Sequence, residues 1–229
     1  RQGLQEAVAG CDLLVDCIGL PARRMQEHPE TARVIAEVVG ATSVRCLQVS
    51  SFWSFLPLRR LPLDEDHPRE GGNRYARARR AAEDTLLGAG AAVVHLPDFF
   101  GPGVHTSVLQ GPLQEAAAGR PMSWLGSPRT EREYVYVPDA MAMVADLAVR
   151  EEAYGRSWVV PGSGPLSCAE AAAMAGEHLG RRVKVRAIPG WLARTVGLVM
   201  PALRPLRPIL EDYLQPIRFD GGRLGDLLG

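Results

Sequence analysis

Short apolar runs rich in β-branched residues alternate along this chain with longer segments that could form helices. The short runs predict buried strands at 12–18, 44–50, 91–97 and 157–160. Residues 29–39 carry apolar side chains at helical spacing and are followed by Gly40. Residues 73–87 contain no Pro or Gly and are followed by Gly88, so both segments are predicted helices. Strands that alternate with helices are typical of α/β proteins with a parallel sheet.

The second half of the chain predicts smaller elements. Helices are expected at 108–118, 138–149, 168–179 and 221–229, a strand and turn at 124–132, and an edge strand at 181–188. Ser167 and Glu170 have the spacing of a capping box. Residues 191–213 are apolar but interrupted by Arg and Pro, which excludes one continuous membrane-spanning helix. This segment is either a cap on a substrate lobe or a patch that contacts lipid or quinone.

The segment from residue 44 to residue 83 carries the candidate chemistry. The strand at 44–50 ends in Ser50-Ser51, at the edge where open α/β sheets bind ligands. Tyr75 and Arg79 lie one turn apart on the following helix, where the cation would favour the phenolate and lower the pKa of Tyr75 from about 10. A general acid or base needs such a shift. The other interpretation is a solvated helix face, on which such pairs are common.

Charge and cysteine content exclude several classes of function. The net charge is zero and no basic block occurs, which argues against a nucleic-acid partner. The four cysteines occur singly and the five histidines are scattered, so no metal site is predicted. We interpret the cysteines as reduced core residues of a cytoplasmic protein.

The order of these motifs resembles a known family. The Ser-Ser pair after a strand, Tyr75-x-x-x-Arg79, Glu83 and the segments 11–19, 93–97, 100–103, 133–139 and 155–167 occur in the same order as in the extended and atypical short-chain dehydrogenase/reductases, the NAD-dependent epimerase/dehydratase family. The resemblance implies a Rossmann-like doubly wound parallel sheet with a small C-terminal substrate lobe. Residues 1–150 would be the C-terminal part of the dinucleotide-binding domain, with substrate-lobe insertions at 100–135, and residues 151–229 mostly the substrate-binding lobe.

The same resemblance assigns roles to individual residues. Ser51, Tyr75 and Arg79 would be catalytic, and the cofactor contacts would come from Ile18, Gly19, Ser50, Tyr75, Arg79 and Pro97. The family has Lys at the position of Arg79. In this chain, all but one of the 26 basic residues are arginine. A planar, bulkier guanidinium is not equivalent to an ammonium group at such a site, so the resemblance leaves activity open.

The chain starts at Arg1, and its glycines do not form the G-x-x-G-x-x-G dinucleotide fingerprint. We therefore expect a fragment that lacks the first two β-α units of the fold, about 60 residues, and that is inactive as given. The residue that selects NAD or NADP would lie upstream of Arg1.

Two functions remain open from the sequence. The first is an NAD(P)-dependent oxidoreductase or epimerase that acts on the carbonyl or hydroxyl of a small molecule, with a Ser-Tyr-Arg variant of the Ser-Tyr-Lys site. The second is a non-catalytic NAD(P)-binding-fold protein that docks to a partner or to a membrane surface through 191–213. The aromatic loop 52–55 is either a pocket lining, which favours a lipid-like or isoprenoid substrate, or a plain cover. The resemblance also suggests a homodimer through helices 30–39 and 74–87.

Overall fold

The computed structural model describes residues 1–105, 107–192 and 214–229, and these divide into two compact units. The first unit comprises Arg1–Leu96, Ala140–Val160 and Asp220–Gly229, and the second comprises Pro97–Asp139 and Pro161–Phe219. The two units are interleaved along the chain. The cofactor and substrate roles assigned to 1–150 and 151–229 stay predictions.

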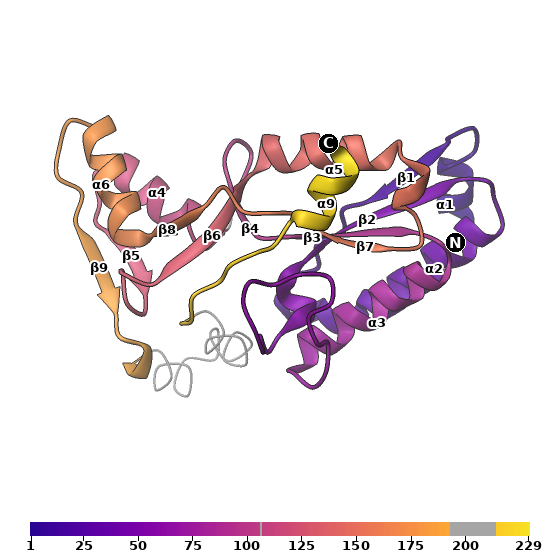
Figure 1. Cartoon of the computed structure of the whole chain (residues 1–229), viewed down its shortest axis with the longest axis horizontal. Coiled ribbons are helices and arrows are strands. Elements are labelled where there is room, and N and C mark those ends of the chain that lie inside the picture. The colour runs from indigo at the N-terminus through magenta and orange to yellow at the C-terminus, as the bar shows by residue number, and fades with distance from the viewer. Residues whose placement is uncertain (106, 193–213) are drawn as a thin grey trace. The chain divides into compact units, whose positions relative to one another are not determined.

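A parallel sheet of four strands forms the centre of the first unit (Figure 1). Its order is β1-β2-β3-β7, with β1 at Leu13–Asp16, β2 at Arg45–Ser51, β3 at Ala92–Leu96 and β7 at Ser157–Val159. Every neighbouring pair is parallel, for example Ser51 beside Leu96. All five residues of β3 are buried, as expected of a central parallel strand. The predicted α/β class with a parallel sheet is confirmed.

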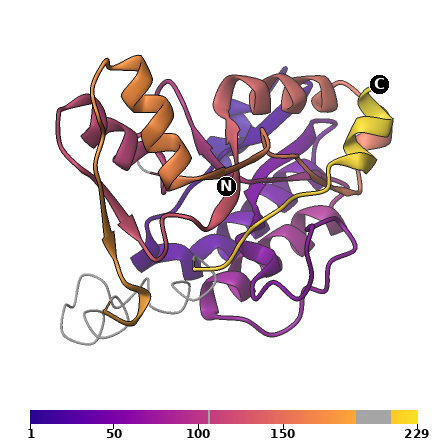
Figure 2. The same ribbon diagram turned by 60° about the vertical axis from the view of Figure 1, so that its left-hand side comes forward.

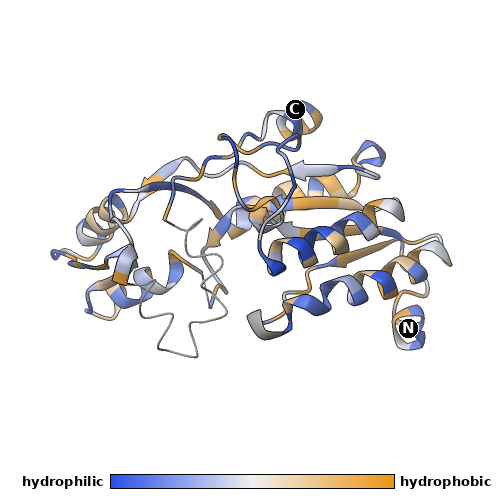
Figure 3. Ribbon diagram, turned by 90° about the horizontal axis from the view of Figure 1, so that it is seen from below, coloured by the Kyte–Doolittle hydropathy of each residue, from blue (hydrophilic) through white to orange (hydrophobic). Residues whose placement is uncertain are grey.

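Helices cover both faces of this sheet. Figures 1 and 2 show α2 (His28–Gly40) and α3 (Arg74–Gly88) on one face and α5 (Val137–Ala148) on the other. The short helices α1 (Gln2–Ala7) and α9 (Gly222–Leu228) complete the unit, with 3-10 turns η1 (Ala22–Glu27), η2 (Phe52–Phe55) and η3 (Glu151–Ala153). In Figure 3 the strands are mainly hydrophobic, whereas the outer faces of α2 and α3 are largely hydrophilic.

Local sequence signals explain where α3 begins and ends. The Asn73 side chain accepts hydrogen bonds from the backbone N–H groups of Tyr75 at 2.9 Å and Ala76 at 3.0 Å, which caps the first turn. The helix ends at Gly88, and Gly90 follows with φ +83°, which favours glycine. The predicted helices 29–39 and 73–87 are thus confirmed to within one residue at each end.

The second unit contains a three-stranded sheet and a separate strand pair. Strand β4 (Asp98–Phe100) is parallel to β6 (Glu131–Tyr136), which is antiparallel to β8 (Pro165–Ser167), and β5 (Met122–Leu125) is parallel to β9 (Val185–Ile188). Helices α4 (Gln110–Ala117) and α6 (Cys168–His178) pack with these strands around a core that includes Met122, Trp124 and Tyr134.

Two predictions in this unit can be compared directly with the structure. The capping box is confirmed, because the Ser167 and Glu170 side chains each accept a hydrogen bond from the other's backbone N–H. The expected strand and turn at 124–132 instead divide into the end of β5, a turn and the start of β6. Gly126 with φ +84° ends β5, and Pro128 has no N–H to offer a ladder.

Most of the segment 191–213, predicted to be either a cap on a substrate lobe or a patch that contacts lipid or quinone, lies outside the described residues. Within the ranges that the structure describes, no helix is both long enough and apolar enough to cross a bilayer. The four cysteines are free thiols: Cys46 and Cys168 are buried, as predicted, whereas Cys11 and Cys17 are exposed, so the prediction of a core position is wrong for these two.

Three histidines are buried in the first unit, and two of them, His28 and His95, generate a prediction about pH. Burial, with the positive charge of Arg79 nearby, lowers the pKa of His28 to about 4. Burial, with Arg69 and Arg79 nearby, lowers the pKa of His95 to about 3. Both values lie below the ordinary value of 6.5. The neutral forms therefore stabilise the fold fully above pH 6.5, and this contribution is lost as the pH falls toward 4 and 3.

We expect the free energy of unfolding of the wild type to fall, relative to that of His95→Gln, by about 1.4 kcal/mol per pH unit between pH 6 and pH 4. Urea unfolding at several pH values measures this difference. His178→Gln, at an exposed position, is the control and should run parallel to the wild type. Parallel curves for His95→Gln and the wild type would contradict the prediction.

Candidate functional site

The two serines at the carboxyl end of β2 have different surroundings. Ser50 is buried, and its hydroxyl donates a hydrogen bond to the Glu83 carboxylate. Ser51 is half-buried, and its Oγ accepts from the backbone N–H of Trp53 at 3.4 Å, which caps η2. Successive side chains of a strand point to opposite faces, so Ser50 is the serine directed at α3.

Tyr75 lies in the first turn of α3 and is only 2% exposed. Its hydroxyl accepts a hydrogen bond of 2.9 Å from Nη2 of Arg74. The Arg74 guanidinium also lies over the tyrosine ring, 4.9 Å from the ring centroid, in a cation–π contact. The cation that contacts the phenol is therefore the residue before it in the sequence.

Arg79 follows one helical turn after Tyr75 and is half-buried. Burial lowers the pKa of its guanidinium, and the carboxylates of Glu83 and Asp16 oppose this shift. Its Nε atom is buried and has no hydrogen-bond partner within the described ranges. For Arg79, burial therefore outweighs the opposing effect of the two carboxylates.

The structure places Ser51, Tyr75 and Arg79 in the same unit, on β2 and on the helix that packs against β2 and η2. It does not join them to one another by hydrogen bonds in the part of the chain that it describes: Ser51 binds the backbone of η2, and Tyr75 binds Arg74. Their shared catalytic role stays a prediction.

The predicted cofactor contacts Ile18 and Gly19 follow the carboxyl end of β1. The backbone N–H of Ile18 donates to Asp16 at 3.0 Å, and Gln48 donates to the other oxygen of the same carboxylate at 3.1 Å. A Cβ atom placed on Gly19 would meet no atom within 4 Å, so the space beside this glycine is open. Pro97 is the first residue of the second unit, directly after β3.

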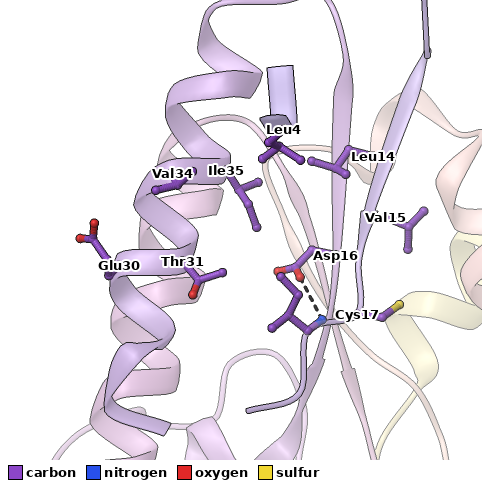
Figure 4. A pocket seen from close by; sticks show the side chains of 10 residues that line it. Leu4, Leu14, Val15, Asp16, Cys17, Glu30, Thr31, Val34 and Ile35 are labelled. Atoms are coloured by element: carbon purple, nitrogen blue, oxygen red, sulfur yellow. Dashed lines mark hydrogen bonds between the residues drawn. The ribbon is translucent and has the colours of Figure 1, made fainter. Parts of the chain in front are cut away.

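A cavity of about 540 Å³ lies beside this end of β1 (Figure 4). Side chains of Leu4 from α1, Leu14 from β1, and Val34 and Ile35 from α2 give it an apolar lining. Asp16 is one of its few charged groups, with Glu30 at its margin. The sequence analysis singled out Ile18 and Gly19 but not this cavity, because its lining comes from three separated segments.

A buried polar cluster behind Ser50 was not recognised as a group from the sequence. Glu83 is fully buried and pairs with Arg69, and its Oε1 lies 3.8 Å from Nδ1 of His95. The Ser54 hydroxyl lies 3.5 Å from the same nitrogen. Glu83 lies four residues after Arg79 and eight after Tyr75, so the helical spacing already placed it on their face.

Burial raises the pKa of Glu83 to about 7, although Arg69, the Ser50 hydroxyl and Arg79 each favour the carboxylate and oppose the shift. His95 is neutral near pH 7, since its pKa is lowered to about 3. Among the described residues, no group of three or more His, Cys, Asp or Glu side chains could hold a metal ion.

Comparison with known proteins rests on structure alone. No family model and no curated protein matches the sequence. An epimerase from Methanothermobacter thermautotrophicus superposes with a TM-score of 0.80 at 15% identity, covering 99% of this chain and 69% of that chain.

Two further enzymes have the same fold. UDP-glucuronic acid 4-epimerase from Bacillus cereus, in complex with UDP-glucuronic acid and NAD, has a TM-score of 0.78 at 12% identity and covers 98% of this chain and 71% of that chain. dTDP-glucose 4,6-dehydratase from Bacillus anthracis, in complex with NAD, has a TM-score of 0.77 at 12% identity, with coverages of 98% and 69%. The chain therefore has the Rossmann-like fold of NAD-dependent epimerases and dehydratases, and the resemblance found in the motif order is confirmed at the level of the fold.

Proposed function

We propose that this chain belongs to an NAD-dependent oxidoreductase or epimerase that acts on a hydroxyl or carbonyl group of a small molecule. The observation that carries the proposal is the placement of Ser51 at the carboxyl end of a parallel strand, with Tyr75 in the first turn of the helix packed against it. Solved structures of this fold include epimerases and dehydratases in complex with NAD, which supports NAD as the cofactor.

Each side chain has a defined task in this proposal. Tyr75 transfers a proton at the substrate oxygen, and the Ser51 hydroxyl donates a hydrogen bond that orients that oxygen. Arg74 donates a hydrogen bond to the phenol, and Arg79 lies one turn further along α3. Bound NAD would supply hydride transfer at the substrate carbon that carries this oxygen.

The residues that follow β1 and β3 would hold the cofactor. Gly19 has open space beside it, and Ile18 is 44% exposed, so both have room for a ligand. Pro97 would contribute through its backbone. The Ser50 hydroxyl already donates to Glu83, which supports an indirect role for Ser50.

The substrate class is narrowed by the aromatic turn. Phe52 and Phe55 are each 1% exposed and belong to the core of the first unit, which favours a plain cover over a pocket lining. This removes the main support for a lipid-like substrate. A nucleotide sugar is the better candidate, because a neighbour of this fold was solved with UDP-glucuronic acid.

One observation favours the second function, a non-catalytic protein that docks to a partner or membrane. Arg79 interacts with Asp16 and Glu83, and the hydrogen bond to the phenol comes from Arg74 instead. The predicted homodimer, the cytoplasmic location and the membrane contact of 191–213 stay predictions.

We expect Gly19→Val to weaken NADH binding about tenfold, because the added side chain would fill the open space beside β1. A fluorescence titration with NADH and NADPH measures the affinity and the choice of cofactor. Gly40→Val also places a side chain where no atom lies within 4 Å, at the end of α2, and serves as the control. Equal NADH affinity in the two variants would contradict the assignment of Gly19.

We expect Tyr75→Phe to lower kcat by at least a hundredfold in an assay of NAD reduction or epimerisation with nucleotide sugars, because the proton donor is lost. The control is Tyr154→Phe, since the Tyr154 hydroxyl donates to the Ala148 carbonyl elsewhere in the first unit. A Tyr75→Phe protein that keeps the wild-type rate would remove Tyr75 from the chemistry.

We expect Arg79→Gln to lower turnover at least tenfold and Arg79→Lys to keep it within tenfold, because lysine retains the charge. Rates are measured with the substrates used for Tyr75→Phe. If the wild type is inactive and Arg79→Lys gains activity, the chain is a degenerate enzyme. If both are inactive and the protein binds liposomes or a partner, the docking function is favoured.

A further inference from the structure

Glu83 is the most deeply buried charged group of the face that carries Tyr75 and Arg79. The three residues follow one another at intervals of four along α3 and so occupy one face of the helix. Glu83 has 0% exposure and lies where α3 packs against the end of β2 and η2. A carboxylate buried to this degree is costly unless every side of it is satisfied.

Its two oxygens contact groups from different elements. Oε1 accepts from the Ser50 hydroxyl of β2 and lies 3.8 Å from the His95 ring of β3. Oε2 accepts from Arg69, which belongs to the loop between η2 and α3. The Ser54 hydroxyl of η2 also favours the ionised form of Glu83 through a hydrogen bond. The carboxylate thus ties four parts of the chain to α3.

The groups that face Glu83 include two cations and a titratable imidazole. Arg69 and Arg79 are the cations that face it, and Arg69 also pairs with Asp84 at 3.3 Å and lies 5.5 Å from the Phe55 ring centroid. His95, the other titratable group in contact, is neutral near pH 7. The cluster is therefore held together by hydrogen bonds and one strong ion pair.

The residues that Glu83 contacts are neighbours of Ser51, on which the proposed function depends. Ser50 precedes Ser51 in β2, and η2 begins directly after Ser51. Fixing Ser50 and Ser54 on both sides of Ser51 leaves its backbone little freedom relative to α3. Tyr75 is on the same rigid helix.

We propose that Glu83 is a positioning residue of this site: its carboxylate holds the Ser50–Phe55 segment against α3 and so sets where the Ser51 hydroxyl lies relative to Tyr75. The proposal rests on the proposed function. It assigns a task to a buried charge that does not itself touch substrate or cofactor.

The test uses Glu83→Gln, which keeps the shape of the side chain but removes the negative charge. The matched control is Asp84→Asn, which removes a charge from the next residue and from the same Arg69, at a side chain that is 66% exposed. Hydrogen–deuterium exchange at pH 8 follows the amides of 50–55 and, as an internal reference, those of β7.

We expect Glu83→Gln to speed exchange at 50–55 about tenfold and to leave β7 unchanged, with less than a twofold effect of Asp84→Asn. If the amides of 50–55 exchange in Glu83→Gln at the wild-type rate, the proposal is overturned. Faster exchange throughout the first unit, β7 included, would also overturn it, because Glu83 would then act only on general stability.

The kinetic constants kcat and KM supply a second measurement, which a purely structural role of Glu83 would not change. In an active wild type, Glu83→Gln should lower kcat about tenfold with KM values within twofold. Ser50→Ala should lower kcat to a similar degree. In the double variant the decrease in kcat should be smaller than the product of the two single decreases, since both substitutions remove the same Ser50–Glu83 hydrogen bond. An unchanged kcat would overturn the positioning role. If the protein to which this chain belongs shows no turnover, the proposed function fails, whereas hydrogen exchange still decides whether Glu83 holds the segment.

Discussion

The structure of the first unit depends on how the end of β2 is joined to α3. The main-chain ladder of the sheet ends there, and the polar groups beyond it need other partners. A single carboxylate, Glu83, provides them by accepting hydrogen bonds from Ser50 and Arg69. The two arginines that face it offset part of the cost of burying this charge. The aromatic side chains of η2 then exclude water from the cluster.

Residues of the same type that lie close together in the sequence make different contacts in this arrangement. Ser50 and Ser51 are adjacent, yet Ser50 faces the buried cluster and Ser51 caps η2. Arg74 and Arg79 are likewise both near Tyr75, yet the hydrogen bond to the phenol comes from Arg74. Local geometry, rather than the type of residue, decides which serine and which arginine can take part in chemistry.

The sequence predicted the class of fold and most helices because their signals are local. Asn73 and Gly88 mark the ends of α3, and the apolar runs mark the buried strands. The interleaving of the two units and the proximity of Asp16 to Arg79 could not be predicted, since both depend on contacts between distant segments of the chain. Glu83 itself was visible in the spacing of α3, but its burial and its contacts with Ser50 and Arg69 were not.

The position of β1 has a practical consequence. Among the described residues, this strand pairs with β2 alone, so its other edge offers unpaired backbone groups, and Val15 is 43% exposed. Protected sheets avoid such edges because a free edge recruits strands from other molecules. A strand added along this edge, from the same protein or from another molecule, would satisfy those backbone groups.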